Sequence, residues 1–305
     1  MQRLGLCCLF RKVPVAFRTT TASYIGRCTD RGEPILQFLS EIISENVKNL
    51  LSAVICCSEQ RIGSFRIGSR LFPLYTHPEF GYQLDDLPGR IEILKGLRLV
   101  KEAAEARSIR LTFHPDQFVV LNSPFSEVVV KSIQELEYHG FMARLVGADV
   151  INIHGGGGYG DKKAALVRLV ENCARLSTGV RERLTLENDD IVYTPRELLP
   201  VCRMLQIPLV YDVHHHRCLQ DGLTIEQATD EACTTWQREP LFHISSPKGG
   251  WRSSNSRLHD DYIDPLDIPA CWKGIDPLTI DIEAKAKEEA VLLLRSHLLK
   301  QGWKL

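Results

Sequence analysis

Six histidine and carboxylate side chains recur at the ends of short apolar runs: His114, His154, Glu187, Asp212, His243 and Glu283. The intervals between successive members resemble the length of one strand plus one helix. Buried carboxylates and imidazoles are costly alone but satisfied when they share metal ions. We expect such a set to hold two or three divalent ions. Mn²⁺, Zn²⁺ or Fe²⁺ suit this mixture of nitrogen and oxygen better than Mg²⁺, which prefers oxygen alone.

The elements that must position these side chains are short β-rich runs alternating with segments of helical period. Eight runs are expected as strands: Arg3–Cys8, Ser64–Gly68, Arg110–His114, Val150–His154, Leu184–Glu187, Leu209–Val213, Leu241–Ser245 and Leu278–Glu283. A (β/α)₈ barrel brings all its strand carboxyl ends to one rim. The sequence therefore predicts an α/β fold, a single TIM barrel over residues 1–305, irregular around its first units. A doubly wound sheet is the alternative, but it normally has a glycine-rich turn after the first strand.

Composition excludes several classes of protein. The chain has 305 residues, a formal net charge of −1 and 44% hydrophobic residues, as in ordinary globular proteins. It has no apolar run of the roughly 20 residues that span a bilayer, so no membrane association is expected. Its ten cysteines show no C-x-x-C spacing and are expected to be free thiols. A globally basic nucleic-acid binder is excluded, whereas a local basic patch is not.

Further residues lie near the predicted rim. His214, His215 and His216 cannot all point inward, and His215, three residues after Asp212, is the best-placed ligand. His214 and His216 are expected behind the ligands or at the surface, and Asp281 could face the barrel interior. His139 lies in a helical segment and is expected at the surface. The glycine-rich segment 155–160 lacks the ending of a P-loop, so we expect a flexible loop that lets backbone amides approach a ligand.

The ordered set of motifs resembles the UV damage endonucleases over nearly the whole chain. Its parts are Arg3-Leu4-Gly5, Phe65–Ser69 with Pro73 and His77-Pro78, His114–Phe118, His154–Gly156, Leu186–Asp189, Asp212–His215, His243–Ser246 and Glu283–Lys285. A looser similarity extends to the endonuclease IV and sugar-isomerase barrels. The resemblance implies a metal-dependent endonuclease that incises double-stranded DNA immediately 5′ of a UV photoproduct, leaving 3′-hydroxyl and 5′-phosphate ends.

The resemblance also implies roles for individual residues. His114, His154 and Glu187 would hold one metal, with Glu187 bridging to a second completed by Asp212, His243 and Glu283. His215 and His259 would bind a third, and Mn²⁺ is the expected ion. Glu187 and Glu283 are the expected catalytic carboxylates around the nucleophilic water, and Lys285 is counted with them. Gln117 and Phe118 stand where the family carries a Gln–Tyr pair that inserts into the duplex, and Phe118 keeps the aromatic face.

Cations near the predicted rim are candidate phosphate contacts. They are Arg66 and Arg70 after the second run, Lys285 after the eighth, and Lys248, Arg252 and Arg257, which with Trp251 lie in the loop after the seventh. We expect a cytoplasmic monomer, nucleoid-associated if the source is bacterial, without an organic cofactor.

Three departures from the family pattern concern the site. Leu6 replaces a tyrosine beside the lesion, Leu241 replaces a lysine two residues before His243, and Arg257-Leu258-His259 replaces an Asp-x-His. The last departure makes the third metal site the weakest. An apurinic-site endonuclease, a metal-dependent sugar isomerase and a non-catalytic damage-recognition module remain as alternatives. Activity on abasic or undamaged DNA, or on a sugar, would distinguish them.

Overall fold

Eight parallel strands close into a barrel in the order β1 to β8, in the computed structural model that describes residues 2–305. Their bounds are β1 Gln2–Cys7, β2 Ser64–Ile67, β3 Arg110–Phe113, β4 Val150–His154, β5 Leu184–Glu187, β6 Leu209–Asp212, β7 Leu241–Ile244 and β8 Leu278–Ile282. Pairing of β1 with β8 completes the ring. The predicted fold class is therefore confirmed, and each strand agrees with its predicted run to within one residue at either end.

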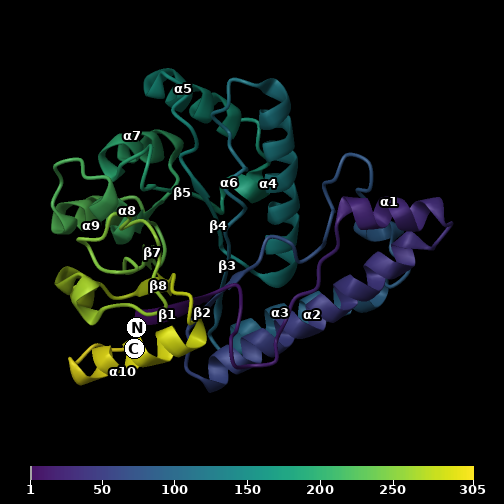
Figure 1. The fold of residues 1–305 in the computed structure, drawn as a ribbon, viewed down its shortest axis with the longest axis horizontal. Coiled ribbons are helices and arrows are strands. Elements are labelled where there is room, and N and C mark those ends of the chain that lie inside the picture. Colours follow the sequence, from purple (N-terminus) through teal and green to yellow (C-terminus); the bar gives the residue numbers. More distant parts are fainter. Residues whose placement is uncertain (1) are drawn as a thin grey trace.

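Helices surround the barrel. They are α1 Ala22–Asp30, α2 Ile35–Glu59, α3 Arg90–Ala106, α4 Ser126–Val146, α5 Lys162–Cys173, α6 Thr178–Arg181, α7 Pro195–Leu205, α8 Val213–Cys218, α9 Ile225–Cys233 and α10 Glu288–Lys300, with short 3₁₀ turns η1 Leu84–Asp86, η2 Pro265–Asp267 and η3 Ala270–Gly274. The irregularity expected early in the chain is the insertion of α1 before α2. Figure 1 shows α1 and the long pair α2 and α3 extending to one side of the barrel.

Local sequence explains where several helices begin. Asp161 caps α5 by accepting a hydrogen bond from the amide of Ala164. Thr194 and Thr224 open α7 and α9 with capping boxes, in which each threonine and the side chain three residues on satisfy each other's backbone amides. These caps determine the residue at which each helix begins after the loop that follows a strand.

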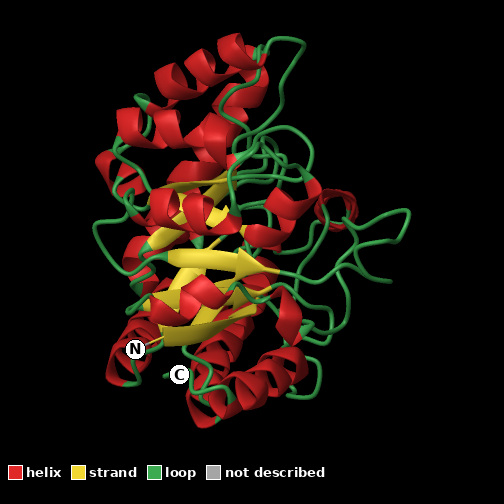
Figure 2. Ribbon diagram, turned by 90° about the vertical axis from the view of Figure 1, so that its left-hand side faces the viewer, coloured by secondary structure: helices red, strands yellow, loops and turns green. Residues whose placement is uncertain are grey.

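The carboxyl ends of the strands form the functional rim. In Figure 2 the arrowheads point toward the side where the long loops gather, whereas the strands themselves are packed among helices. Strand side chains alternate between the helix-packed outer face and the barrel interior, where Ser64, Thr112, Asn152, Thr185 and Thr279 are all buried. The interior is thus polar beneath the rim.

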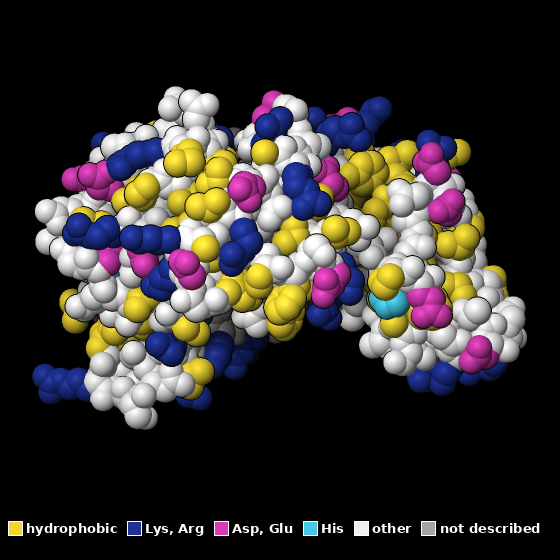
Figure 3. All heavy atoms as spheres, turned by 90° about the horizontal axis from the view of Figure 1, so that it is seen from above, with side chains coloured by type: hydrophobic (Ala, Val, Ile, Leu, Met, Phe, Trp, Pro, Cys, Tyr) yellow, Lys and Arg dark blue, Asp and Glu magenta, His cyan; other side chains and the backbone are white. Residues whose placement is uncertain are grey.

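The surface agrees with the near-zero net charge. On the face drawn in Figure 3, lysine and arginine side chains are interspersed with aspartate and glutamate. All ten cysteines are free thiols. Within residues 2–305, the helices fall short of the combination of length and apolarity that a bilayer crossing requires.

Candidate metal centre

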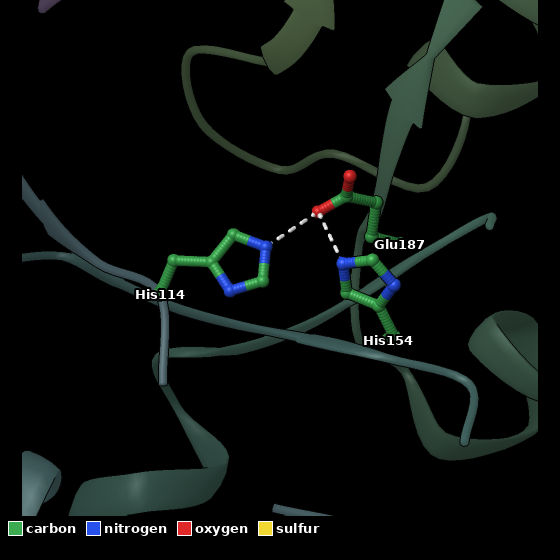
Figure 4. A group of neighbouring side chains, drawn as sticks. All are labelled: His114, His154 and Glu187. Atoms are coloured by element: carbon green, nitrogen blue, oxygen red, sulfur yellow. Dashed lines mark hydrogen bonds and ion pairs between the residues drawn. The ribbon is translucent and has the colours of Figure 1, made fainter. Parts of the chain in front are cut away.

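Glu187 lies at the centre of the predicted ligand set. It is the last residue of β5, and its side chain is fully buried. Nε2 of His114, which directly follows β3, lies 2.9 Å from Oε2 of Glu187. Nε2 of His154, at the end of β4, lies 3.8 Å from the same oxygen. Figure 4 shows both imidazoles directed at this one carboxylate oxygen. Three strand ends that are distant in sequence therefore meet at a single group.

The second oxygen of Glu187 faces two further imidazoles. Its Oε1 lies 3.2 Å from Nδ1 of His243 and 3.4 Å from Nδ1 of His215. Nδ1 of His215 is also 3.5 Å from Oδ2 of Asp212. Asp212 caps α8 by accepting a hydrogen bond from the His215 amide at 2.8 Å, so the turn after β6 places both side chains.

Glu283, directly after β8, completes the cluster on its other side. Its Oε1 lies 3.4 Å from Nδ1 of His243, and its Oε2 lies 3.7 Å from Nδ1 of His259. The backbone of His259 pairs with that of Pro247 in an isolated antiparallel bridge, which folds the loop after β7 back and brings His259 to the site. All eight residues predicted as metal ligands therefore gather at one end of the barrel.

Arg66 requires a correction. We expected it after the second strand as a DNA contact, but it lies within β2, is only 7% exposed and points into the barrel. Its guanidinium donates hydrogen bonds to Asp281 at 3.1 Å and Glu283 at 2.6 Å, and lies 2.8 Å from Nε2 of His243. Ser64 and Arg66 share the inner face, whereas Phe65 and Ile67 lie in the outer hydrophobic core, where the Phe65 ring packs against Phe10 and Phe17. Arg66 is thus an interior partner of the acidic ligands.

Polar groups below the rim support Glu187. The side chain of Asn152 donates a short hydrogen bond to Oε2 of Glu187 and accepts one from the Thr185 hydroxyl at 2.8 Å. Asn152 was not among the predicted site residues. Its position two residues before His154 on the same strand was the available signal, because alternate residues of a strand share a face.

Electrostatics keep Glu187 and Glu283 ionised. Burial raises the pKa of Glu187, but the imidazoles of His243, His154 and His114 outweigh it and hold that pKa well below its ordinary value. Burial likewise raises the pKa of Glu283, but the charges of Arg66 and His243 have the larger effect and lower that pKa below its ordinary value. Burial lowers the pKa of His215, yet Asp212 and Glu187 raise it to about 9.

The donor set fits divalent cations. Two groups of three side chains offer mutually close ligand atoms: His114, His154 and Glu187, and Glu187, Asp212 and His215. In addition, Oε1 of Glu187, Oδ2 of Asp212 and Oδ1 of Asp281 are buried without accepting a hydrogen bond from residues 2–305. Buried carboxylate oxygens normally have a donor or a cation, so these three favour a metal. The ligand atom of His215 is thus grouped with those of Glu187 and Asp212. His259, with which His215 was predicted to bind the third ion, is outside this group, and the two ring centroids are 6.3 Å apart.

The other histidines have structural contacts. His216 is buried between the Tyr211 hydroxyl, 2.8 Å from its Nδ1, and Oδ1 of Asp221, 3.1 Å from its Nε2. His214 is buried behind the ligands, as expected. His139 is fully buried, so the prediction that it lies at the surface is wrong. It packs in α4 against Phe113, because this helix lies between the barrel and its neighbours.

A cavity of about 990 Å³ opens beside His154, and we call it the groove. Its walls include residues of the loops after β2, β3, β4 and β5, among them Arg70, Gln117, Phe118, Gly156, Tyr159, Asp189 and Ile191. Phe118 is 77% exposed, and Gln117 is also exposed. The predicted wedge pair thus stands free at the edge of the groove.

The loop after β7 holds the remaining predicted DNA contacts. Lys248, Arg252 and Arg257 are exposed, and Arg257 forms an ion pair of 3.5 Å with Asp190. Trp251 lies on His214, with ring centroids 5.2 Å apart, and donates a hydrogen bond to Asp267. Lys285 is exposed on the rim two residues after Glu283.

Comparison with known proteins identifies the family. The family described as "UV-endonuclease UvdE" matches residues 2–302. The chain belongs to this family. It is 36% identical over 278 residues to the UV-damage endonuclease of Neurospora crassa, covering 85% of this chain and 41% of that protein. It is 33% identical over 307 residues to the UV DNA damage endonuclease of Nostoc sp., covering 96% and 89% respectively.

A member of the family also has a similar solved structure. The crystal structure of SacUVDE matches this chain with a TM-score of 0.86 and 26% identity, covering all of both chains. The match therefore runs over the whole of the barrel described above. The chain spans under half of the length of the Neurospora crassa relative. The predicted membership in this family is confirmed.

Proposed function

We propose that this chain is a metal-dependent endonuclease that hydrolyses the DNA phosphodiester immediately 5′ of UV photoproducts. Cyclobutane pyrimidine dimers and 6-4 photoproducts are the proposed lesions, and 3′-hydroxyl and 5′-phosphate ends are the proposed products. The convergence of four imidazoles on Glu187, in a chain of the UV-endonuclease family, carries the proposal. The relatives named above are UV damage endonucleases, rather than apurinic-site endonucleases or sugar isomerases.

Different side chains of the site are proposed to bind the metal ions, to orient the attacking water and to contact the phosphate. His114, His154, Asp212, His215, His243 and His259, together with Glu187 and Glu283, would hold two or three divalent ions, with Mn²⁺ the proposed metal. Ions bound there supply a water of lowered pKa and neutralise charge on the phosphate. Glu187 and Glu283 are the proposed catalytic carboxylates, because both stay ionised and can hold the ions and orient the attacking water between them. Lys285 is proposed to contact the phosphate from the rim.

Lesion engagement would use the groove and its surroundings. The exposed ring of Phe118 can stack between bases of the duplex, with Gln117 beside it. Arg70, Lys248, Arg252 and Arg257, with Trp251, are the proposed contacts to the DNA backbone. These cations come from two loops on the rim that carries the ligand cluster.

Exchanging Glu187 for glutamine tests the proposal. Glu187→Gln keeps the shape but removes the charge between the imidazoles, and we expect incision of a dimer-containing duplex to fall at least about 10²–10³-fold. Glu182→Gln, the same change at an exposed position five residues earlier, should leave activity unchanged. Both are assayed with Mn²⁺ on dimer-containing, abasic and undamaged duplexes. Full activity in Glu187→Gln, or a wild type that cuts only abasic DNA, would refute the proposal.

A further inference from the structure

Three consecutive loops form one wall of the groove. They are the β3 loop (residues 114–125), the β4 loop (residues 155–161) and the β5 loop (residues 188–194). They follow the strands that present His114, His154 and Glu187, so whatever fixes the loops also fixes the surface next to these ligands. Each loop has one large side chain exposed at or near this wall, namely Phe118, Tyr159 and Ile191.

Asn122 joins the β3 loop to the β4 loop. Its side chain is fully buried, and its amide nitrogen donates to the carbonyl oxygens of Gly155 and Gly157, each at 2.8 Å. Its amide oxygen accepts from the backbone nitrogen of Gly157 at 3.2 Å. Gly156, between them, has φ of +85°, and a Cβ there would lie 2.3 Å from Oδ1 of Asn122. The glycine-rich segment, which the sequence led us to expect as a flexible loop, is thus bound by three hydrogen bonds to one buried side chain.

Tyr193 joins the β4 loop to the β5 loop. Its buried hydroxyl donates to the carbonyl oxygen of Gly157 at 3.1 Å. Its backbone nitrogen donates to the carboxylate of Asp189 at 3.0 Å, and the Asp189 nitrogen donates to its carbonyl at 2.9 Å. Asn122 and Tyr193 therefore share Gly157 as an acceptor and connect all three loops through buried hydrogen bonds.

The links between the loops are distinct from the contacts that anchor them. The β3 loop is separately tied to α5, because Asn172 donates to the Leu121 carbonyl at 2.8 Å and Arg168 donates to the Asn122 carbonyl at 2.9 Å. The β5 loop is closed by Asp189 itself, which also accepts from the Ile191 amide at 2.8 Å. Breaking the links should let the loops shift against one another while each stays attached to the barrel.

We propose that Asn122 and Tyr193 are positioning residues that set the groove for damaged DNA. This inference rests on the proposed function. The pair touches neither the ligand cluster nor the exposed faces of Phe118 and Ile191, and acts by holding the loops that carry them. His154 and Glu187 are the last residues of their strands, and His114 directly follows β3. Because these ligands lie at the strand ends and Asn122 and Tyr193 lie further along the loops, we expect the pair to determine substrate binding rather than the chemical step.

Tyr193→Phe and Asn122→Asp test this role. The first removes only the hydroxyl, and the second replaces the donor to Gly155 and Gly157 with a carboxylate of the same shape. Asn172→Ala is the control, because it removes an amide that anchors the β3 loop but does not contact the β4 loop. Hydrogen exchange of the β4 loop without DNA, Mn²⁺ affinity, and KM and kcat on a dimer-containing duplex are measured for each variant and for the double variant.

We expect exchange of the β4 loop to rise about tenfold or more in both variants. KM should rise by about three- to tenfold, with kcat and Mn²⁺ affinity within about twofold of wild type. The double variant should be no worse than about the larger single effect, since both residues act through Gly157. Unchanged exchange, unchanged KM, a fall in kcat alone, or equal effects of Asn172→Ala would overturn the inference. A wild type that fails to cut the dimer duplex would refute the proposed function instead, while the exchange data would still test the links.

Discussion

The buried arginine inside the barrel allows a quantitative test. Arg66 is 2.6 Å from Glu283 and 3.1 Å from Asp281, with side-chain exposures of 9% for the arginine, 15% for the glutamate and 0% for the aspartate. Arg66→Met keeps the apolar stem but leaves both carboxylates without their cation. Removing one partner of a buried pair costs about 3–5 kcal/mol. With an unfolding entropy of about 2.1 cal/mol/K per residue, a chain of this size should lose about 5–8 °C in Tm.

The assay is thermal unfolding in the presence of a chelator, so that bound metal does not stand in for the lost cation. Arg18→Met is the matched control, because Arg18 pairs with Glu45 at 2.6 Å but both side chains are 48% exposed. Such exposed pairs contribute about 0–1 kcal/mol. Adding Mn²⁺ should narrow the difference between Arg66→Met and wild type, since a divalent ion can neutralise the same carboxylates. A Tm within about 2 °C of wild type, or an equal loss in Arg18→Met, would refute this account of Arg66.

Three further outcomes follow from the structure. In metal-free protein the pKa of His215 in the folded state is about 9, above its ordinary value. His215 therefore contributes about 3 kcal/mol to the free energy of unfolding. This contribution is fully present below pH about 6.5 and is lost as the pH rises through about 9. Urea unfolding against pH should show this loss, and His215→Gln should flatten it. Phe118→Ala should leave the free energy of unfolding within about 0.5 kcal/mol while reducing incision of dimer-containing duplex, and Phe118→Tyr should retain activity; equal incision by the alanine variant would remove the wedge role. Gly5→Ala should destabilise the protein by about 1–3 kcal/mol in chemical denaturation, because its Cβ would lie 2.0 Å from Oδ1 of Asp281, whereas Gly274→Ala meets no atom within 4 Å and should be neutral.

The strands and their ligands could be predicted because two regular patterns coincide. Each strand is a short apolar run, and five of the ligands end or directly follow one, namely His114, His154, Glu187, Asp212 and Glu283. The closure of a barrel therefore brings these five together without further information. His114, His154 and Glu187 illustrate this, because their mutual contacts need only three correct strand ends.

The partners of these ligands could not be predicted in the same way. Whether Arg66 points inward depends on the phase of the strand and on what packs against its other face, and arginine is rarely buried unless paired. Its partners Asp281 and Glu283 are more than 200 positions away. The links from Asn122 to Gly155 and Gly157 likewise depend on the path of two loops, which has no sequence period.

The position of Trp251, packed against His214 on an exposed loop, has a practical consequence. Trp236, Trp272 and Trp303 are 8%, 0% and 6% exposed, whereas Trp251 is 38% exposed on the loop after β7. A soluble quencher such as acrylamide should therefore reach Trp251 before the other three. The part of the tryptophan emission that acrylamide quenches most readily therefore reports on this loop without a label, and its change on adding Mn²⁺ or duplex DNA can be measured in separate titrations.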